Sequence, residues 1–326
     1  MMTSKKLVGI TVVVIGLVSL FFYIEISSST HVKTAPSEDS ISIQLQAEID
    51  LGKKLFSDTR LSRNETISCL TCHVPQKAFT DGLKKSIGIN GLVALRNAPS
   101  LYNIADAPYF MHDGGVPTLE MQAIVPIQDL NEMGFSMKEL IVRLKTIPEY
   151  VSIFEKVYQR EIDAWTITRS LAQFEKTLIS KQSRFDLFLM DSVKHPLSQN
   201  ERNGWKLFSS DFGCIECHAL PNFTSYDFAT NYLTNITEED PGRFRITRKE
   251  EDRGNFKIPS LRNITLTAPY MHDGSYETLE EVVQAYFNAK KSTIRPESQL
   301  TKKEISDLIA FFGTLIDTSS VDLTEF

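Results

Sequence analysis

Cysteine is scarce in this sequence, and its placement limits what the thiols can do. The 326 residues contain four cysteines, and all four lie in two short motifs, at 69–73 (CLTCH) and 214–218 (CIECH). Once both motifs are assigned to one task, no cysteine is left for a structural disulfide. The stability of the chain must therefore come from other sources.

Two further shortages concern positive charge and strand patterns. Lys and Arg number 35 against 41 Asp and Glu, which gives a formal net charge of -6. Nucleic-acid binding depends on basic surfaces, so this acidic balance argues against a nucleic-acid partner. Stretches with the alternating pattern of β-strands are sparse, and we therefore expect a mainly α fold with long loops.

The pattern C-x-x-C-H is the attachment motif of a covalently bound c-type haem. Its two thiols form thioethers with the porphyrin, and the adjacent histidine can take an axial position on the iron. Two such motifs predict two haems and a redox function. The alternatives are thioredoxin-like dithiols or one zinc site built from both pairs, but a histidine follows each pair directly and no βαβ pattern surrounds either. The expected attachment residues are Cys69, Cys72, Cys214 and Cys217, and the axial histidines are His73 and His218.

The N-terminus has the pattern of a targeting segment. Lys5 and Lys6 precede an uncharged run over 7–23, which predicts a signal peptide or an uncleaved membrane anchor over residues 1–26. A flexible tether is expected over 27–41. Bacterial c-type haem is attached outside the inner membrane, so we expect a periplasmic protein that contacts the membrane only through its N-terminal segment.

The chain repeats itself around the two motifs. A Gly-x-Lys-Leu-Phe-Ser block precedes each motif, and further shared blocks follow at a constant offset of 160 residues. This self-similarity predicts duplication of one domain. The paired blocks are 52–57 with 204–209, 99–104 with 259–264, 111–114 with 271–274, and 118–120 with 278–280.

Each half also ends in a helical pattern. Apolar residues at helical spacing fall on one face of each segment, and Thr301 with Glu304 forms a capping box for the second. We expect two cytochrome c-like haem domains related by internal duplication, over 42–185 and 201–326, joined by a linker over 186–200. The apolar faces consist of Ile167, Leu171, Phe174 and Leu178, and of Ile305, Leu308, Ile309, Phe312 and Leu315.

These motifs, together with residues 96–99, 122–134 and 258–280, resemble the bacterial di-haem cytochrome c peroxidase family, which includes the MauG-type enzymes. The resemblance covers roughly residues 43–318. It implies that the N-terminal haem binds and cleaves hydrogen peroxide. The C-terminal haem would receive electrons from a small donor protein, a cytochrome c or a cupredoxin, and pass them across the domain interface. Members of this family are often homodimers.

The resemblance also implies roles for individual residues. Glu132 and Gln122 match the pair beside the peroxide: the carboxyl moves a proton between the peroxide oxygens and the amide orients the substrate. Many relatives hold a calcium ion between the domains, and the matching ligands are the Asn97 side chain and the backbone carbonyls of Thr267 and Pro269. Oxygen ligands of this kind suit calcium; without the resemblance, Asn and Pro here would be read as turn residues.

The sequence departs from the family pattern in the loop before Arg96. Many members place a histidine there that ligates the peroxide-binding haem at rest. Residues 81–95 contain no histidine. We therefore expect an enzyme that is active without reductive activation.

Two other departures concern the second haem and the domain interface. Fourteen residues after His272, where electron-transferring peroxidases place a methionine ligand, this chain has Tyr286, as MauG-type enzymes do. If Tyr286 is the ligand, its phenolate would favour ferric iron and lower the potential relative to methionine. Met271 is the alternative ligand. His112 stands where the family usually has a tryptophan between the haems. Histidine carries an electron hole less well than tryptophan does, and a structural role for His112 is the simpler interpretation.

Three functions follow from these observations. The first is a peroxidase that reduces hydrogen peroxide to water with electrons from a small donor. The second is a MauG-type enzyme that oxidises Trp or Tyr of a partner protein through a high-valent di-haem state, which Tyr286 favours. The third is a non-catalytic di-haem electron carrier, against which Glu132 and Gln122 argue.

Overall fold

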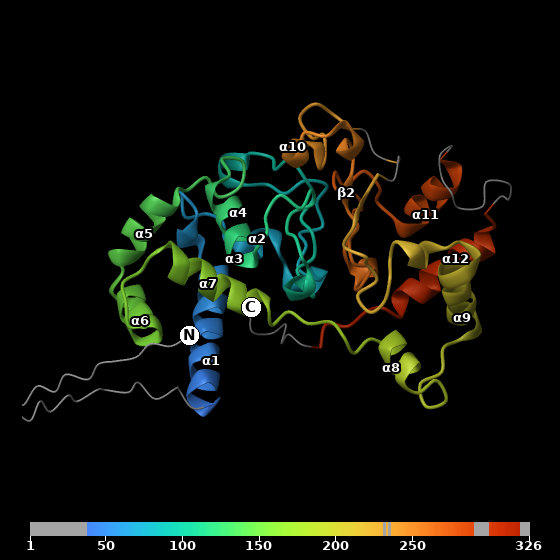
Figure 1. Cartoon of the computed structure of the whole chain (residues 1–326), viewed down its shortest axis with the longest axis horizontal. Helices are drawn as coiled ribbons and strands as arrows, with labels where there is room; N and C mark the ends of the chain where they lie inside the picture. The colour runs from blue at the N-terminus through green and yellow to red at the C-terminus, as the bar shows by residue number, and fades with distance from the viewer. Residues whose placement is uncertain (1–37, 231–232, 234–235, 290–299, 320–326) are drawn as a thin grey trace, which may run out of the picture.

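The computed structural model describes residues 38–230, 233, 236–289 and 300–319 (Figure 1). The predicted signal or anchor over 1–26 lies outside this part of the chain. Helix α1 (Glu38–Ser57) already includes the last four residues of the predicted tether, so that prediction ran too far. Within the described ranges, no helix is long and apolar enough to cross a membrane.

The fold is mainly helical, as expected, and falls into two halves that lie side by side (Figure 1). The strands are limited to one short antiparallel pair, β1 (Phe228–Ala229) and β2 (Phe256–Lys257), among the described residues. The first half contains α1, α2 (Cys69–Cys72), α3 (Leu119–Gln122), α4 (Ile124–Gln128), α5 (Met137–Lys145), α6 (Pro148–Tyr158) and α7 (Ala164–Glu175). The rest contains α8 (Arg184–Met190), α9 (Gln199–Lys206), α10 (Phe244–Thr247), α11 (Leu279–Asn288) and α12 (Lys302–Gly313).

Side chains cap the N-termini of several helices. The Asp163 carboxylate accepts the Thr166 N–H at the start of α7. At the start of α12, the Thr301 hydroxyl accepts the Glu304 N–H, and the Glu304 carboxylate accepts the Thr301 N–H in return. This is the predicted capping box, which satisfies two backbone donors at once.

The duplication is visible in the way the main helices cross. In the first half α1 crosses α7 at Gly52, where a Cβ atom would lie 1.9 Å from the Ser170 carbonyl oxygen. In the second half α9 crosses α12 at Gly204, where a Cβ atom would lie 1.9 Å from the Asp307 carbonyl oxygen. Only glycine allows backbones to approach so closely. The two cytochrome c-like domains are thereby confirmed as copies of one design.

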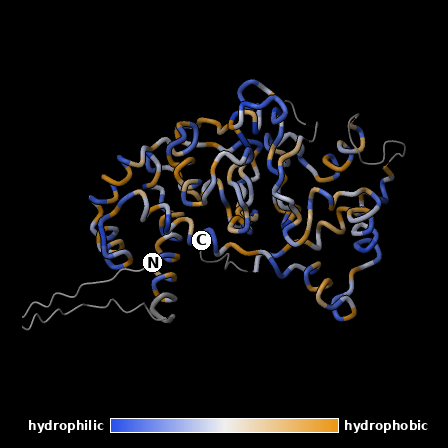
Figure 2. The backbone as a smooth tube through the Cα atoms, viewed as in Figure 1, coloured by the Kyte–Doolittle hydropathy of each residue, from blue (hydrophilic) through white to orange (hydrophobic). Residues whose placement is uncertain are grey.

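Each half has its own apolar core, and Figure 2 shows that both halves contain apolar segments. Phe56 of α1 packs against Phe174 of α7 with ring centroids 5.1 Å apart. Phe208, which follows α9, packs against Phe311 of α12 at 5.2 Å. Equivalent aromatic contacts therefore close both helix crossings.

Helix α8 corrects the predicted domain boundary. The boundary at residue 185 cuts this helix, yet the Phe185 side chain is fully buried in the second core. Its N–H also donates to the Thr314 carbonyl, at 3.0 Å. The second domain thus begins before the predicted linker, because burial of an aromatic ring holds α8 against it.

The polar stretch 224–255, which has no counterpart in the first half, holds the two halves together. Phe228 covers Gly114 of the first half so closely that a Cβ there would lie 2.3 Å from its ring. Arg245 pairs with Asp113 at 2.5 Å, and Asp240 pairs with Arg96 at 2.6 Å. The insertion therefore acts as a clamp across the domain interface.

Candidate active site

The first haem site is defined here as Cys69, Cys72 and His73. Short helix α2 carries the two thiols, and the His73 N–H closes it by donating to the Cys69 carbonyl at 2.9 Å. The His73 Nδ1–H donates to the Phe79 carbonyl at 2.8 Å. Burial lowers the pKa of His73, which keeps the imidazole neutral. Its Nε2 lone pair is thus free to bind a metal, the arrangement that orients metal-binding histidines generally.

The second haem site is defined as Cys214, Cys217 and His218. The His218 Nδ1 lies 3.1 Å from both the Phe223 and the Pro259 carbonyl oxygens. Burial again lowers the pKa of this histidine. Both sites therefore offer two reduced thiols and one neutral imidazole with its Nε2 unengaged by these contacts, which is the donor set that a c-type haem requires.

Glu132 lies in a tight turn beside the first haem site. Its N–H donates to the Asp129 carbonyl at 3.1 Å, and its carbonyl accepts the Ile89 N–H at 2.8 Å. Burial, with a smaller contribution from Asp129, raises the pKa of Glu132 to about 7. The Glu132 charge in turn raises the pKa of the Cys69 and Cys72 thiols, which places its carboxyl toward the site.

The loop 81–95 packs on the Glu132 turn. A Cβ atom on Gly88 would lie 2.0 Å from the Asn131 carbonyl oxygen, so only glycine permits this approach. The Ile89 side chain reaches Gly134 on the other side of the turn. The loop that lacks a histidine is therefore fixed beside Glu132. Gln122 ends helix α3 and is half-buried.

Tyr286 and Met271 occupy different kinds of structure in the second half. Tyr286 lies on α11, two turns beyond the buried Leu279 and one turn beyond the buried Val283, so all three share the inward face of the helix. Met271 lies in a turn with φ of 75°, and Met111 repeats that turn in the first half with φ of 67°. The methionine is thus part of a backbone motif common to both halves.

His112 lies at the domain interface, where its Nε2–H donates to the Asn97 carbonyl at 3.0 Å. Burial and the neighbouring Arg96 lower its pKa to about 4, so the ring is neutral. His272, its counterpart in the second half, stacks on Phe256 with ring centroids 3.8 Å apart. The structural role predicted for His112 agrees with this bond, which holds the Asn97 segment in place.

Of the predicted calcium ligands, Asn97 is joined through its backbone to the segment that follows the other two. The Asn97 N–H donates to the His272 carbonyl at 2.8 Å, which brings the turn after Thr267 and Pro269 to Asn97. The Asn97 amide Nδ2 donates to the Leu83 carbonyl at 2.7 Å, so Oδ1 is the atom that would meet a cation. Calcium binding stays a prediction.

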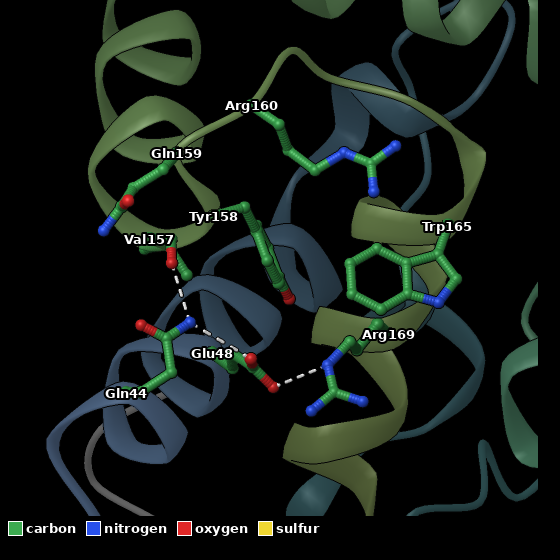
Figure 3. A pocket seen from close by; sticks show the side chains of 8 residues that line it. All are labelled: Gln44, Glu48, Val157, Tyr158, Gln159, Arg160, Trp165 and Arg169. Carbon is green, nitrogen blue, oxygen red and sulfur yellow. Dashed lines mark hydrogen bonds and ion pairs between the residues drawn. The ribbon is translucent and has the colours of Figure 1, made fainter. Parts of the chain in front are cut away.

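A pocket of about 560 Å³ lies elsewhere, between α1, α6 and α7 (Figure 3). Trp165 forms its wall, with the Arg160 and Arg169 guanidinium groups each 5.3 Å from the ring centre. Arg169 pairs with Glu48 at 2.9 Å. None of the residues assigned to the haem sites lines this pocket, and its charges compensate one another locally.

Sequence reasoning missed two features of the sites. Glu175, at the end of α7, is buried beside the first haem site. Arg96, buried at the interface, pairs with both Asp113 and Asp240. Arg96 belongs to the block 96–99, which resembles the di-haem peroxidase family, and this marked it as a residue of interest. Its ion pairs could not be predicted, because Asp240 is distant in the chain.

Two domains of one design, each with a c-type haem attachment motif, and a half-buried carboxyl with a raised pKa beside one of the motifs define a di-haem oxidoreductase. Residues 46–194 match the family model described as "Di-haem cytochrome c peroxidase". "Methylamine utilization protein MauG" of Methylorubrum extorquens is 34% identical over 275 residues, which cover 82% of this chain and 78% of that protein. "Cytochrome c551 peroxidase" of Nitrosomonas europaea is 36% identical over 270 residues, covering 82% and 79%.

Among solved structures, a MauG-like protein associated with microbial copper homeostasis superimposes with a TM-score of 0.74. It is 32% identical, over 84% of this chain and 91% of that one. The chain belongs to the di-haem cytochrome c peroxidase family, as its motifs predicted, and membership implies an oxidoreductase with two c-type haems. The relatives include proteins named as peroxidases and proteins named MauG.

Proposed function

We propose that this protein reduces hydrogen peroxide to water with electrons from a small donor protein, without reductive activation. The observation that carries the proposal is the half-buried Glu132 carboxyl, whose pKa of about 7 suits both uptake and release of a proton near neutral pH. An electron carrier has no need for such a group. The mildly acidic chain suits a basic donor.

In this proposal the haem supplies the redox chemistry and the protein supplies the proton transfers. The Glu132 carboxylate accepts a proton from the peroxide oxygen nearer the metal and returns it to the outer oxygen, which leaves as water. The Gln122 amide orients the peroxide by hydrogen bonding. Two electrons from the donor and two protons complete the conversion of one peroxide into two water molecules. His73 and His218 would each hold one of the two irons through the Nε2 atom.

The first prediction concerns activation. Because residues 81–95 contain no histidine and are fixed on the Glu132 turn, the first iron should have no protein ligand on its peroxide face. The fully oxidised protein should therefore turn over without prior reduction. Electron paramagnetic resonance of that form should show a high-spin component; a spectrum with only low-spin bis-histidine haem would contradict the prediction.

One mixing experiment distinguishes the proposed activity from its alternatives. The oxidised protein is mixed with hydrogen peroxide, and reduced cytochrome c is then added. Rapid oxidation of the cytochrome supports the peroxidase. A long-lived oxidised species that does not react with cytochrome supports a MauG-type enzyme, and the absence of any spectral change supports a carrier.

The second candidate function is the MauG-type oxidation of Trp or Tyr on a partner protein. Tyr286 favours it, because its place on the inward face of α11 suits a ligand of the second haem. Phenolate stabilises higher oxidation states of iron relative to a thioether ligand. Met271 lies in a turn that is repeated at Met111 in the first half, so the methionine there can be explained by the turn without a role as a haem ligand. This adds support for Tyr286.

The second prediction separates the two ligands. Tyr286→Phe should change the absorption spectrum of the second haem and raise its potential, because it removes the phenolate. Met271→Leu, the matched control, should leave the spectrum unchanged. The reverse pattern would show that Met271 is the ligand, and would leave the peroxidase as the better candidate.

The predicted location follows from the same function. A periplasmic site, reached through the segment over 1–26, is compatible with covalent haem attachment and with small soluble donors. The predicted homodimer stays a prediction.

A further inference from the structure

Glu175 is an ionisable group that the proposed reaction does not use. It is the last residue of α7, and it is only 5% exposed to solvent. Its Oε2 atom is buried and has no hydrogen-bond partner among the described residues. A buried carboxyl that lacks hydrogen-bond partners lowers the stability of the folded protein, so a group of this kind is expected to serve a function.

Helix α7 brings Glu175 close to the first haem site: Phe174, the residue before it, packs against Phe56, whose ring centroid lies 6.3 Å from that of His73. Among charged groups, Glu175 has the largest effect on the Cys69 thiol, whose pKa it helps to raise after burial itself. The charged groups that face Glu175 are Glu120 on α3 and Lys176 on its own chain segment. Those two pair with each other at 2.9 Å, so Lys176 is not dedicated to Glu175. Burial and Glu120 raise the pKa of Glu175 to about 8.

The second half shows that the fold itself does not require a carboxyl here. The Thr177 hydroxyl donates to the Phe174 carbonyl at 2.7 Å, and the Thr314 hydroxyl donates to the Phe311 carbonyl at 2.6 Å. This equivalence aligns Glu175 with Phe312. Phe312 is buried and packs edge-on against Phe208 with centroids 6.2 Å apart. An apolar ring thus fills the same place in the sister domain.

Asp81, another carboxyl near the first haem site, also has one buried oxygen without a hydrogen-bond partner, Oδ2, but its other oxygen is bonded. The Asp81 Oδ1 accepts the Leu83 N–H at 2.9 Å, and Asp81 acts on Cys72 and His73. Glu132 lies in its turn on the peroxide side. In the second half, no carboxylate contributes to the pKa of His218, where burial and two backbone carbonyls act alone. Glu216 and Asp227 do act on the Cys217 thiol, so the two sites differ at the histidine: a carboxylate acts on His73 and none on His218.

We propose that Glu175 is the group that binds a proton when the first haem accepts an electron and releases it when that haem is oxidised. This inference rests on the haem attachment in the proposed function. An electron added to the site raises the cost of a carboxylate beside it, because charges interact strongly in a poorly solvated interior. At a pH where Glu175 is ionised before the electron arrives, one electron comes from the donor protein and one proton from solvent, so that Glu175 changes from COO⁻ to COOH and the net charge of the site stays constant. Glu175 does not contact the substrate in this proposal; its charge acts on the reaction only by changing the reduction potential of the first haem.

The test is the pH dependence of the potential of the first haem, followed through its own absorption bands in a spectroelectrochemical titration. In the unmodified protein the potential should fall as pH rises through the titration of Glu175, with up to one proton per electron. Glu175→Gln should remove that slope and hold the potential at its low-pH value. The control Glu120→Gln should keep the slope and move it to lower pH, because Glu120 raises the pKa of Glu175.

Several outcomes would overturn the inference. An unchanged slope in Glu175→Gln, or a slope lost in Glu132→Gln instead, would assign the proton to another group. If Glu175→Gln does not fold, infrared difference spectra of the unmodified protein decide, since a protonated carboxyl band must appear on reduction; its absence refutes the inference. A haem assay that finds fewer than two covalent haems would refute the proposed function as well, whereas two haems with an unchanged slope refute this inference alone.

Discussion

Glu132→Gln is expected to lower kcat/KM for hydrogen peroxide by about 10²–10⁴-fold, the usual contribution of a positioned general acid–base group. The amide keeps the size of the side chain but cannot take the proton from peroxide. The turn should survive, because its bonds to Asp129 and Ile89 are made by the Glu132 backbone. Steady-state oxidation of reduced cytochrome c measures the loss, and absorption spectra check that both haems are still bound.

Asp129→Asn is the matched control, since it changes a neighbouring carboxylate in the same turn. The Asp129 side chain accepts the Asn131 N–H at 2.8 Å, a bond that the amide oxygen of asparagine can retain. We expect its maximal rate to stay within a few-fold of the unmodified protein. Equal activities of Glu132→Gln and the unmodified protein would rule out the assigned proton transfer.

The pH profile gives the same prediction a second readout. The pKa of Glu132 is raised to about 7, mainly by burial, so the carboxyl is protonated below that pH and ionised above it. Because the ionised form accepts the proton, kcat/KM for peroxide should rise as pH increases through about 7. Asp129→Asn should move this rise to lower pH, since Asp129 contributes to the raised pKa. Glu132→Gln should abolish it.

Features that depend on local sequence were predictable here. The haem motifs, the capping box at Thr301 and the apolar face of α12 each involve residues within one or two turns of helix. The duplication was also readable, because it repeats residue types at a constant offset. Gly52 and Gly204 were visible as repeated positions, although their reason, contact with a backbone carbonyl of a distant helix, was not.

Features that depend on distant partners were not predictable. Glu175 falls on a polar-looking helix end, and only the packed structure shows that it is buried. Phe185 looked like the end of the first domain, yet it is buried in the core of the second. Asp240 lies in a polar insertion without a counterpart, and its partner Arg96 is far away in the chain. A single sequence does not specify which distant charges will be buried together.

Arg96→Met is expected to destabilise the folded protein by about 3–5 kcal/mol, the usual cost of removing one partner from a buried ion pair. The Arg96 guanidinium bonds Asp240 at 2.6 Å and Asp113 at 2.9 Å, and all three side chains are nearly inaccessible to solvent. Methionine fills part of the volume but leaves the buried Asp240 carboxylate without its arginine partner, while Asp113 keeps only the pair with Arg245. The melting temperature should fall by roughly 5–15 °C, as measured by calorimetry of the haem-loaded protein.

Arg245→Met provides the control, because Arg245 also pairs with Asp113 but its side chain is 43% exposed. An exposed partner contributes little, so its loss should cost no more than about 1 kcal/mol. Combining Arg96→Met with Asp113→Asn and Asp240→Asn should recover much of the lost stability, since no buried charge is then left without a partner. Equal effects of the two arginine substitutions would mean that the clamp formed by residues 224–255 depends on its apolar contacts, such as Phe228 on Gly114, rather than on the buried charges.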